Sequence, residues 1–303
     1  GSPLPLTLGH EISGVVEAAG AELGALLHQQ VVIPAVIPCG RCALCTSGRG
    51  SICRQQIFPG SDVAGGFASH IVVPGHSLCP VDDTRLKQSG LELADLAVLA
   101  DAVSTPYQAV IRSGLRKEDT VVVVGVGGVG GFAVQIAAAL GGRVIALDVS
   151  EERLAAVAPY GAQHCICTKG RDPMEVRKEV SGYVKQQGMN PLEWKIFECS
   201  GHSGGQSQAF ALLTFGAFLS VVGYTLEKVT VRLSNLMAFD ATAQGNWGCL
   251  PSLYPDALRL ILDRKIALLP FIERRPLSSI NETMNELHQG LLRKRPVLIP
   301  NFS

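Results

Sequence analysis

Apolar and polar positions follow a strand-and-turn pattern in the first third of the chain. Short Val and Ile runs, such as Val31 to Ile33 and Ile71 to Val73, alternate with Gly and Pro every few residues. Such runs, bounded by turn-forming residues, are typical of β-strands rather than of helices. The pattern predicts an irregular β-rich domain that extends to about Val103.

A different pattern begins at Thr120. A continuous apolar strand over Val121 to Val124 leads into a Gly-rich turn, a helix over about Val129 to Leu140 and a second strand over Val144 to Leu147. This succession is a βαβ unit with parallel strands. Further strands are predicted at His164 to Thr168, Lys195 to Cys199, Phe218 to Val222 and Val229 to Leu233, and further helices at Pro173 to Gln186 and Gln206 to Leu213. The alternation predicts an α/β fold with a doubly wound parallel sheet.

Two amphipathic helices are predicted near the end of the chain. They cover Asp256 to Leu262 and Ile280 to Leu291, and Ser279 with Glu282 has the spacing of a capping box at the start of the second. We expect both helices to pack back on the first domain. The predicted organisation is a β-rich domain over residues 1–103, a nucleotide-binding domain over 104–245 and a C-terminal return over 246–303.

Charge and composition narrow the function classes. The 303 residues carry 26 basic and 26 acidic side chains, without the excess of positive charge on which non-specific nucleic-acid binding depends. Every apolar run is shorter than the roughly 20 residues that cross a bilayer. Residues 1–8 have no secretory or transit pattern. These features predict a soluble protein that binds a small molecule rather than nucleic acid or a membrane. Tight C-x2-C cysteine spacing, which favours a metal over disulfides, predicts a cytoplasmic location.

Four of the nine cysteines are crowded into one segment. The spacing C-x2-C-x2-C-x7-C is formed by Cys39, Cys42, Cys45 and Cys53. Four thiolates from one loop can complete a tetrahedron around zinc, which leaves no open position and makes the site structural. The glycines between them supply tight turns. The alternative is a cluster of reduced or disulfide-bonded cysteines.

A glycine-rich turn follows the first buried strand of the second domain. The motif contains Gly125, Gly127, Gly128 and Gly130 and opens the predicted helix, so its backbone can approach a pyrophosphate at the helix N-terminus. The second strand ends at Asp148, whose carboxylate can bind the ribose hydroxyls and would repel a 2′-phosphate. The pattern predicts NAD rather than NADP. Arg153 is a further candidate for ribose binding, and the alternative for the whole motif is a strand–helix turn near a surface aspartate.

The order of four segments identifies a family. They are GHEISG from Gly9, the four-cysteine segment, DAVSTPYQAV from Asp101 and GVGGVGG from Gly125. In this order and approximate spacing, they resemble the zinc-dependent medium-chain alcohol dehydrogenases over essentially the whole chain. The resemblance implies a GroES-like catalytic domain before a Rossmann domain, one structural and one catalytic zinc ion, and hydride transfer from an alcohol to NAD.

The resemblance also implies the residues of the catalytic metal site. His10 matches a zinc ligand, and Glu11 matches a neighbouring acid that binds the metal directly or through water. Asp101 lies where well-known members have a second cysteine ligand, and a carboxylate there makes a harder site. The alternative for Asp101 is a helix N-cap. The family's first zinc ligand and its proton-relay hydroxyl precede the GHE motif, so we expect further residues before Gly1.

Cofactor contacts and assembly are implied in the same way. Thr105 matches a threonine beside the nicotinamide, and Val129 matches the loop residue behind the ring. Arg295 is a candidate for binding the pyrophosphate, and a solvated helix end is the alternative for it. The segment Val229 to Leu233 resembles the edge strand through which family members dimerise, so we expect a homodimer or homotetramer.

Substrate choice rests on a finer resemblance. The segments LPLTLGHEISG and GGFASHIVVP are most similar to the branch that oxidises 6-hydroxycyclohex-1-ene-1-carbonyl-CoA to its 6-oxo thioester in anaerobic aromatic degradation. The alternative enzyme is a polyol, threonine or simple secondary-alcohol dehydrogenase. The alternative of another class is a zinc- and nucleotide-binding relative without catalysis.

Overall fold

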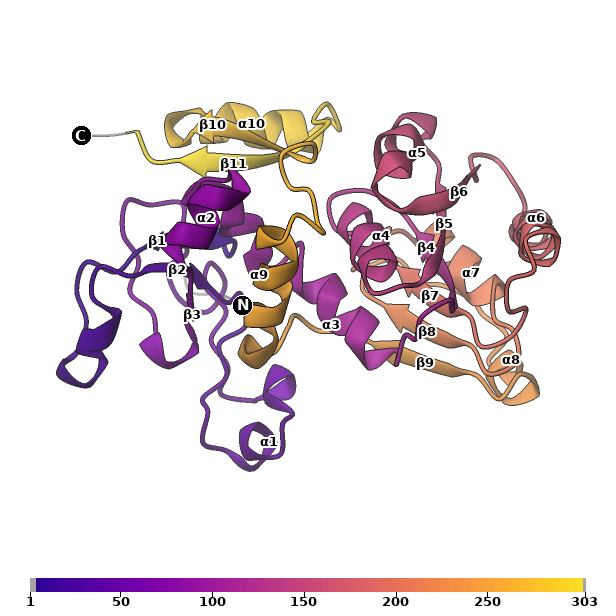
Figure 1. The fold of residues 1–303 in the computed structure, drawn as a ribbon, viewed down its shortest axis with the longest axis horizontal. Helices are drawn as coiled ribbons and strands as arrows, with labels where there is room; N and C mark the ends of the chain where they lie inside the picture. The colour runs from indigo at the N-terminus through magenta and orange to yellow at the C-terminus, as the bar shows by residue number, and fades with distance from the viewer. Residues whose placement is uncertain (1–3, 302–303) are drawn as a thin grey trace. The chain divides into compact units, whose positions relative to one another are not determined.

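The computed structural model describes residues 4–301 and divides into two compact units (Figure 1). Thr105–Asn246 form one unit, which we call the Rossmann unit. Gly1–Ser104 and Trp247–Ser303 form the other, which we call the β-rich unit. The C-terminal stretch thus belongs with the first part of the chain.

The Rossmann unit is built on one parallel sheet, which has six strands within residues 4–301 in the order β6-β5-β4-β7-β8-β9. The strands are β4 (Thr120–Val124), β5 (Arg143–Asp148), β6 (Ala162–Cys167), β7 (Lys195–Glu198), β8 (Phe218–Val221) and β9 (Thr242–Gly245). The first strand of the unit lies in the middle, and the chain winds outward from it in both directions. This is the order of a doubly wound dinucleotide-binding fold, with its switch point between β4 and β7. The predicted fold class is confirmed.

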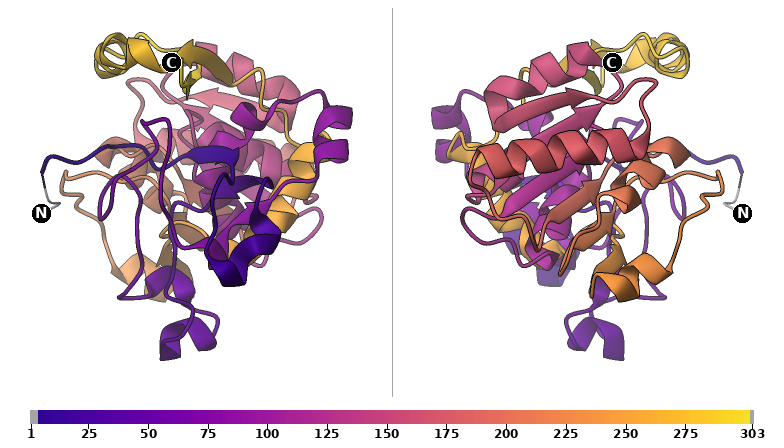
Figure 2. Two further views of the ribbon diagram at one scale, coloured as in Figure 1. Left: turned by 90° about the vertical axis from the view of Figure 1, so that its left-hand side faces the viewer. Right: turned by 90° about the vertical axis from the view of Figure 1, so that its right-hand side faces the viewer.

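Helices cover both faces of this sheet. They are α3 (Ser104–Arg112), α4 (Gly130–Ala139), α5 (Glu151–Val157), α6 (Pro173–Gln186), α7 (Ser203–Ala211) and α8 (Ser234–Ala238). Side chains of α6, α7 and α8 pack with Val122 and Val124 in one apolar cluster, and α6 lies across this face in the right-hand view of Figure 2. Val121 and Val123 point to the opposite face, because side chains alternate along a strand. All four valines are buried, which explains the continuous apolar run.

Two small sheets organise the β-rich unit. An antiparallel sheet contains β1 (Ile12–Val15), β2 (Gln30–Ile33) and β3 (Cys79–Pro80), and a parallel pair contains β10 (Ile272–Pro276) and β11 (Arg295–Ile299). The α-helices are α1 (Ala43–Thr46), α2 (Asp83–Ser89), α9 (Tyr254–Leu262) and α10 (Ile280–His288). The 3-10 helix η4 (Leu93–Ala100) contacts β1, β2 and β11. It therefore connects the two sheets.

Shorter 3-10 turns complete the secondary structure of residues 4–301. They are η1 (Ala21–Leu26), η2 (Gly50–Ile52), η3 (Gly75–Ser77), η5 (Ala158–Tyr160), η6 (Pro251–Leu253) and η7 (Leu277–Ser279). None of the helices in this part of the chain combines the length and the apolar character that a membrane span requires.

Three local predictions are wrong. Neither Ile71 to Val73 nor Val229 to Leu233 forms a strand, and the outer strand of the parallel sheet is β9 instead. Val229 and Val231 are half-buried between exposed neighbours, so the alternation exists, but alternation alone does not supply a neighbouring strand. Ser279 makes no capping hydrogen bond, because its hydroxyl donates to the Pro276 carbonyl at 2.7 Å.

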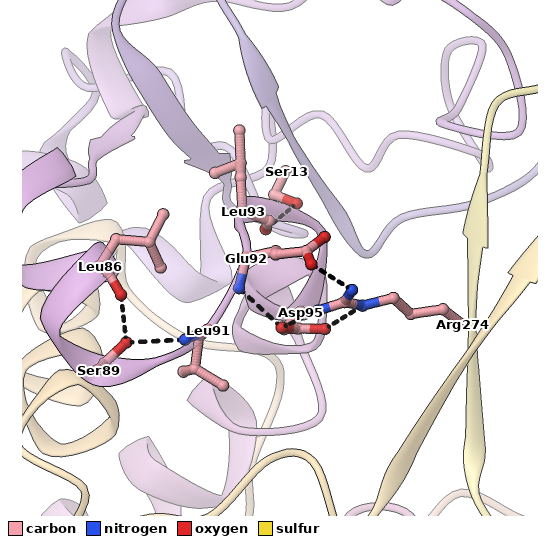
Figure 3. A network of polar contacts seen from close by, with 8 residues as sticks. All are labelled: Ser13, Leu86, Ser89, Leu91, Glu92, Leu93, Asp95 and Arg274. Carbon is pink, nitrogen blue, oxygen red and sulfur yellow. Dashed lines mark hydrogen bonds and ion pairs between the residues drawn. The ribbon is translucent and has the colours of Figure 1, made fainter.

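A buried carboxylate fastens η4 to the C-terminal return (Figure 3). Asp95 is fully buried, and its two oxygens accept hydrogen bonds from Nε and Nη2 of Arg274 at 2.8 and 2.7 Å. Glu92 pairs with Nη1 of the same guanidinium at 2.6 Å. The hydroxyl of Ser13 on β1 donates to the Leu93 carbonyl at 2.7 Å. This network holds the helix that ends directly before the predicted ligand Asp101.

The substitution Arg274→Met tests the network. It leaves the Asp95 carboxylate buried without a counter-charge, so we expect the free energy of unfolding to fall by about 3 kcal/mol, measured by urea denaturation. Arg85→Met is the matched control, because the Arg85–Asp263 pair is 42% and 49% exposed and such pairs contribute roughly 1 kcal/mol or less. Equal losses in the two variants would contradict the anchoring role.

Candidate active site and metal centres

The four predicted cysteines lie on one loop around α1 and η2. Their Sγ–Sγ distances are 3.9 Å for Cys39 and Cys45, 3.5 Å for Cys42 and Cys45, and 3.7 Å for Cys42 and Cys53. All four thiols are free. A tetrahedron with Zn–S bonds of about 2.3 Å has edges of about 3.8 Å, whereas a disulfide needs about 2.05 Å. The sulfur positions therefore fit a structural zinc ion.

Thiol acidity differs across this lobe. Hydrogen bonds from the backbone N–H groups of Arg41 and Cys42 lower the pKa of Cys39 to about 6. Desolvation and the neighbouring thiols raise the pKa of Cys45 to about 12. Four thiolates at these distances repel one another, and a bound dication removes that repulsion. The lobe thus needs a cation to hold all four sulfurs deprotonated.

His10 and Asp101 place two metal-binding groups side by side in the β-rich unit. His10 Nε2 lies 3.4 Å from Asp101 Oδ2, and the side chains are 38% and 26% exposed. Tetrahedral zinc with Zn–N and Zn–O bonds of 2.0 to 2.2 Å separates two ligand atoms by about 3.4 Å. The pair therefore fits two positions of a zinc site. The hydrogen bond to Asp101 raises the pKa of His10, because it stabilises the protonated imidazole.

Both peptide groups that flank Asp101 are fixed. The Ala102 N–H donates to Glu11 Oε1 at 2.7 Å. The buried Tyr254 hydroxyl donates to the Ala100 carbonyl at 2.5 Å. Asp101 follows the end of η4, and these two bonds hold its backbone from either side. The ligand position is therefore set by residues that are distant in the sequence.

Glu11 also pairs with Arg295. Arg295 Nε donates to Glu11 Oε2 at 2.6 Å, and the attraction of this carboxylate raises the pKa of Arg295. With both oxygens engaged, Glu11 orients the backbone beside Asp101 in this structure. Within residues 4–301, the cysteine lobe is the only group of three or more His, Cys, Asp or Glu residues placed to share a metal ion. Metal binding by Glu11 and pyrophosphate binding by Arg295 stay predictions.

Close backbone contacts fix the GHE segment. Gly9 has φ +100°, and its carbonyl accepts a hydrogen bond from the Gly66 N–H at 2.8 Å. A Cβ at Gly65 would lie 2.2 Å from the Gly9 oxygen. Because Gly65 has no side chain, the loop before Phe67 can lie directly against Gly9, the residue that precedes His10. This role was not assigned to Gly65 from the sequence.

An aromatic wall next to His10 was also missed. The rings of His10 and Phe58 are 5.0 Å apart at their centroids, and those of Phe58 and Trp247 are 5.7 Å apart. The Trp247 indole N–H donates to Gln56 Oε1 at 3.2 Å. The three aromatic residues come from separate parts of the β-rich unit, so no sequence spacing connects them.

The glycine-rich loop has the backbone that the sequence predicts. Gly125 has φ +83°, a region that favours glycine. A Cβ at Gly130 would lie 1.7 Å from the Gly125 oxygen, whereas one at Gly127 would meet nothing within 4 Å. Gly128 is exposed. Gly125 and Gly130 therefore pack against each other, whereas the space around Gly127 is free. A pyrophosphate can approach the backbone there.

Asp148 lies directly beside this loop. Its oxygens accept hydrogen bonds from the Val126 N–H at 2.8 Å and the Ser150 N–H at 2.9 Å. Its side chain is 4% exposed, and Arg153 Nη1 lies 3.9 Å away. The structure therefore brings together the loop, the acid and the arginine that the sequence singled out, while ribose binding by Asp148 and Arg153 stays a prediction.

Two further predicted residues belong to the Rossmann unit. Thr105 is buried at the start of α3, and its carbonyl accepts a hydrogen bond from Asn246 Nδ2 at 3.0 Å. Val129 is the N-cap residue of α4. Their contacts with the nicotinamide stay predictions.

A buried acid behind the loop escaped sequence analysis. Glu198 is fully buried, and its Oε1 accepts hydrogen bonds from the N–H and the hydroxyl of Ser200 at 2.8 and 2.5 Å. Burial raises the pKa of Glu198, and the Ser200 bonds oppose this shift. A Cβ at Gly125 would lie 2.5 Å from Ser200 Cα. Glu198 therefore fixes the residue on which the first loop glycine packs.

Comparison with known proteins assigns these features to a family. Residues 128–263 match the model of the zinc-binding dehydrogenases, and residues 1–83 match that of the alcohol dehydrogenase GroES-like domain. The chain belongs to the zinc-dependent medium-chain alcohol dehydrogenase family. It is therefore a nicotinamide-dependent oxidoreductase, as the sequence resemblance implied.

Individual relatives cover nearly the whole chain. An alcohol dehydrogenase of Geobacillus stearothermophilus is 28% identical over 297 residues, which are 97% of this chain and 83% of the relative. L-threonine 3-dehydrogenase of Bacillus subtilis is 29% identical over 303 residues, with 98% and 82% covered. The solved alcohol dehydrogenase of Aeropyrum pernix superimposes with a TM-score of 0.85 at 28% identity and covers 99% of this chain and 84% of its own. Galactitol-1-phosphate dehydrogenase of Escherichia coli has a TM-score of 0.87 at 24% identity, with 98% and 85% covered.

Removal of one lobe cysteine tests the structural zinc site. In Cys45→Ala three thiolates remain, so we expect the zinc content of the purified protein to fall by about one ion per chain, since structural sites are four-coordinate. Mass spectrometry of the metal measures it. Cys167→Ala is the matched control, because Cys167 lies on β6 outside the lobe. Equal zinc contents in both variants would show that the lobe does not hold the ion.

Proposed function

We propose that this protein oxidises a secondary alcohol to a ketone with NAD, using His10 and Asp101 as ligands of a catalytic zinc ion. The observation that carries the proposal is the convergence of these two side chains, with Nε2 and Oδ2 at 3.4 Å. They come from segments far apart in sequence, and hydrogen bonds on both sides of Asp101 support the arrangement. A purely nucleotide-binding relative would have no need of this arrangement.

The chain's own groups set the charge of the site. When bound, zinc supplies a Lewis acid for the substrate oxygen, and the nicotinamide supplies a hydride acceptor. His10 offers a lone pair at Nε2 when its imidazole is neutral, and Asp101 offers one negative charge. Glu11 and Arg295 neutralise each other. These two ligands together contribute a single negative charge, so they withdraw less charge from a dication than the four thiolates of the cysteine lobe.

The surroundings of His10 favour an alcohol with an apolar substituent. Phe58 and Trp247 present aromatic surface next to the imidazole, and the Trp247 N–H is already bonded to Gln56. A polyol or threonine needs additional polar partners beside the reacting carbon. We therefore propose a simple secondary alcohol first, and a polyol or threonine as the alternative. The finer resemblance suggested a 6-hydroxycyclohexenoyl-CoA thioester as the substrate. Because the relatives reported above act on other alcohols, this thioester is included only as a further substrate to test.

Steady-state assays of NADH formation test this function. We expect turnover of a secondary alcohol with an apolar substituent, with galactitol 1-phosphate, threonine and the acyl-CoA as comparison substrates. His10→Ala should abolish it, and Glu11→Gln should lower kcat/KM by about 10- to 100-fold, as for other groups that orient metal ligands. His70→Ala is the control, because its pair with Glu17 is 69% and 70% exposed. Full activity in His10→Ala would refute the proposed metal site.

Asp148 is proposed to select NAD. Its carboxylate would repel a 2′-phosphate at the adenosine ribose, and Gly127 leaves room for the pyrophosphate next to it. Solved relatives at lower identity differ in cofactor: one from Sinorhizobium meliloti is described with NADP and one from Escherichia coli with NADH. The choice therefore depends on residues of this chain rather than on the fold.

Asp148→Asn tests cofactor selection. The amide retains an acceptor for one of the two backbone N–H groups but loses the charge, so we expect the ratio of kcat/KM for NADP to that for NAD to rise roughly tenfold. Glu151→Gln, an exposed acid in the first turn of α5, is the matched control for net charge. An unchanged ratio in Asp148→Asn would assign the selection to another residue.

We also propose that two copies associate through the outer edge of the Rossmann sheet. All four residues of β9 are exposed, and an edge strand without a partner is a template for pairing. Exposed apolar side chains on the segment before it are Tyr224, Leu226, Leu233 and Met237. Burial of this surface in a homodimer, or in a homotetramer built from two such dimers, removes the strand edge and these apolar side chains from water.

A further inference from the structure

A hollow lies in the Rossmann unit at the end of the sheet opposite the glycine-rich loop. Its volume is about 220 Å³, and its walls include Arg177, Ser181, Leu192, Trp194, Phe215 and Phe239. Trp194 directly precedes β7, and Phe215 lies on the turn that leads into β8. The glycine-rich loop follows the carboxyl end of β4, whereas these residues lie at the amino ends of parallel strands. The hollow is therefore a separate site.

Arg177 is the charged group of this hollow. Its Nη1 donates to the Ala211 carbonyl at 2.8 Å, and its guanidinium lies 5.4 Å from the centroid of the Phe239 ring. Within residues 4–301, no carboxylate is within ion-pair distance of Arg177, whereas Arg171 pairs with Glu179 at 2.6 Å. Desolvation lowers the pKa of Arg177. The guanidinium has thus lost part of its hydration without gaining a counter-charge.

Among the other polar groups that line the hollow, the Ser181 hydroxyl is available to bind a ligand. Trp194 Nε1 donates to the Asn190 carbonyl at 3.2 Å, and the Thr214 hydroxyl donates to the Pro191 carbonyl at 3.0 Å. Ser181 lies four residues after Arg177 on α6, which places both on one face of the helix. In the described part of the chain, the Ser181 hydroxyl has no hydrogen-bond partner. Arg177 and Ser181 therefore offer adjacent donors.

We propose that this hollow binds a small carboxylate with a flat apolar body. The guanidinium has five N–H donors in a fork that matches a carboxylate, and only one of them is used by the protein. The apolar part of the lining, from Leu192, Trp194 and Phe215, suits an aromatic or branched aliphatic group. Leu192 and Phe215 are 46% and 58% exposed, so a ligand there would cover apolar surface that now faces water. The site does not depend on the dehydrogenase function.

Trp194 provides the readout. The chain has two tryptophans, so Trp247→Phe leaves Trp194 as the only one, and benzoate is the probe. We expect a saturable change of Trp194 fluorescence with benzoate and none with benzamide, which has the same ring but no charge. Arg177→Met should raise the Kd for benzoate by about 10- to 100-fold, the effect of losing a charged hydrogen-bond partner. Lys178→Met, an exposed cation on the same helix, should leave the Kd unchanged.

A second variant distinguishes loss of benzoate binding from a folding defect. Ser181→Phe keeps Arg177 and fills the hollow from the exposed side of α6, so it should abolish the benzoate response without affecting the Arg177–Ala211 hydrogen bond. Equal affinity for benzoate and benzamide would overturn the proposal, as would an unchanged Kd in both Arg177→Met and Ser181→Phe. Absence of a saturable response in the Trp247→Phe protein would overturn it as well.

Discussion

The carboxylate of Glu11 is the interaction on which the candidate metal site depends. One oxygen holds the Ala102 N–H, and the other holds the Arg295 guanidinium. His10 precedes Glu11 in the chain, and Asp101 precedes Ala102. A single side chain therefore joins the two segments that carry the candidate ligands to the strand β11. A neutral side chain at position 11 could accept one of these bonds but would leave Arg295 without its counter-charge.

The C-terminal return supplies charge as well as packing to the β-rich unit. Arg274 on β10 pairs with the fully buried Asp95, and Arg295 on β11 pairs with Glu11. Burial of a carboxylate is costly unless a cation and further hydrogen bonds accompany it. In both cases the acid comes from the first part of the chain and the arginine from the last. This division explains why residues after the Rossmann unit support a candidate site whose proposed ligands, His10 and Asp101, precede that unit.

Sequence patterns identified the elements whose signals are local. The run Val121 to Val124, the glycine turn and Asp148 were found because a buried parallel strand and a phosphate loop restrict residue types at consecutive positions. Val229 to Leu233 was wrong because alternation does not reveal whether a neighbouring strand exists. The true outer strand, β9, consists of Thr, Ala, Gln and Gly, all exposed, and carries no apolar signal. Composition alone could not have found it.

The candidate site shows the same limit. His10 and Asp101 were recognised from motifs, but Phe58, Trp247 and the bonds of Glu11 are long-range contacts that no local spacing encodes. The two metal centres nevertheless differ in a way that follows from their ligands. Four thiolates surround the lobe position and more than neutralise a dication, whereas His10 and Asp101 contribute one negative charge. A metal in the lobe is therefore electrostatically quenched and suited to structure, whereas the two proposed ligands His10 and Asp101 would withdraw less of the positive charge that polarises an alcohol.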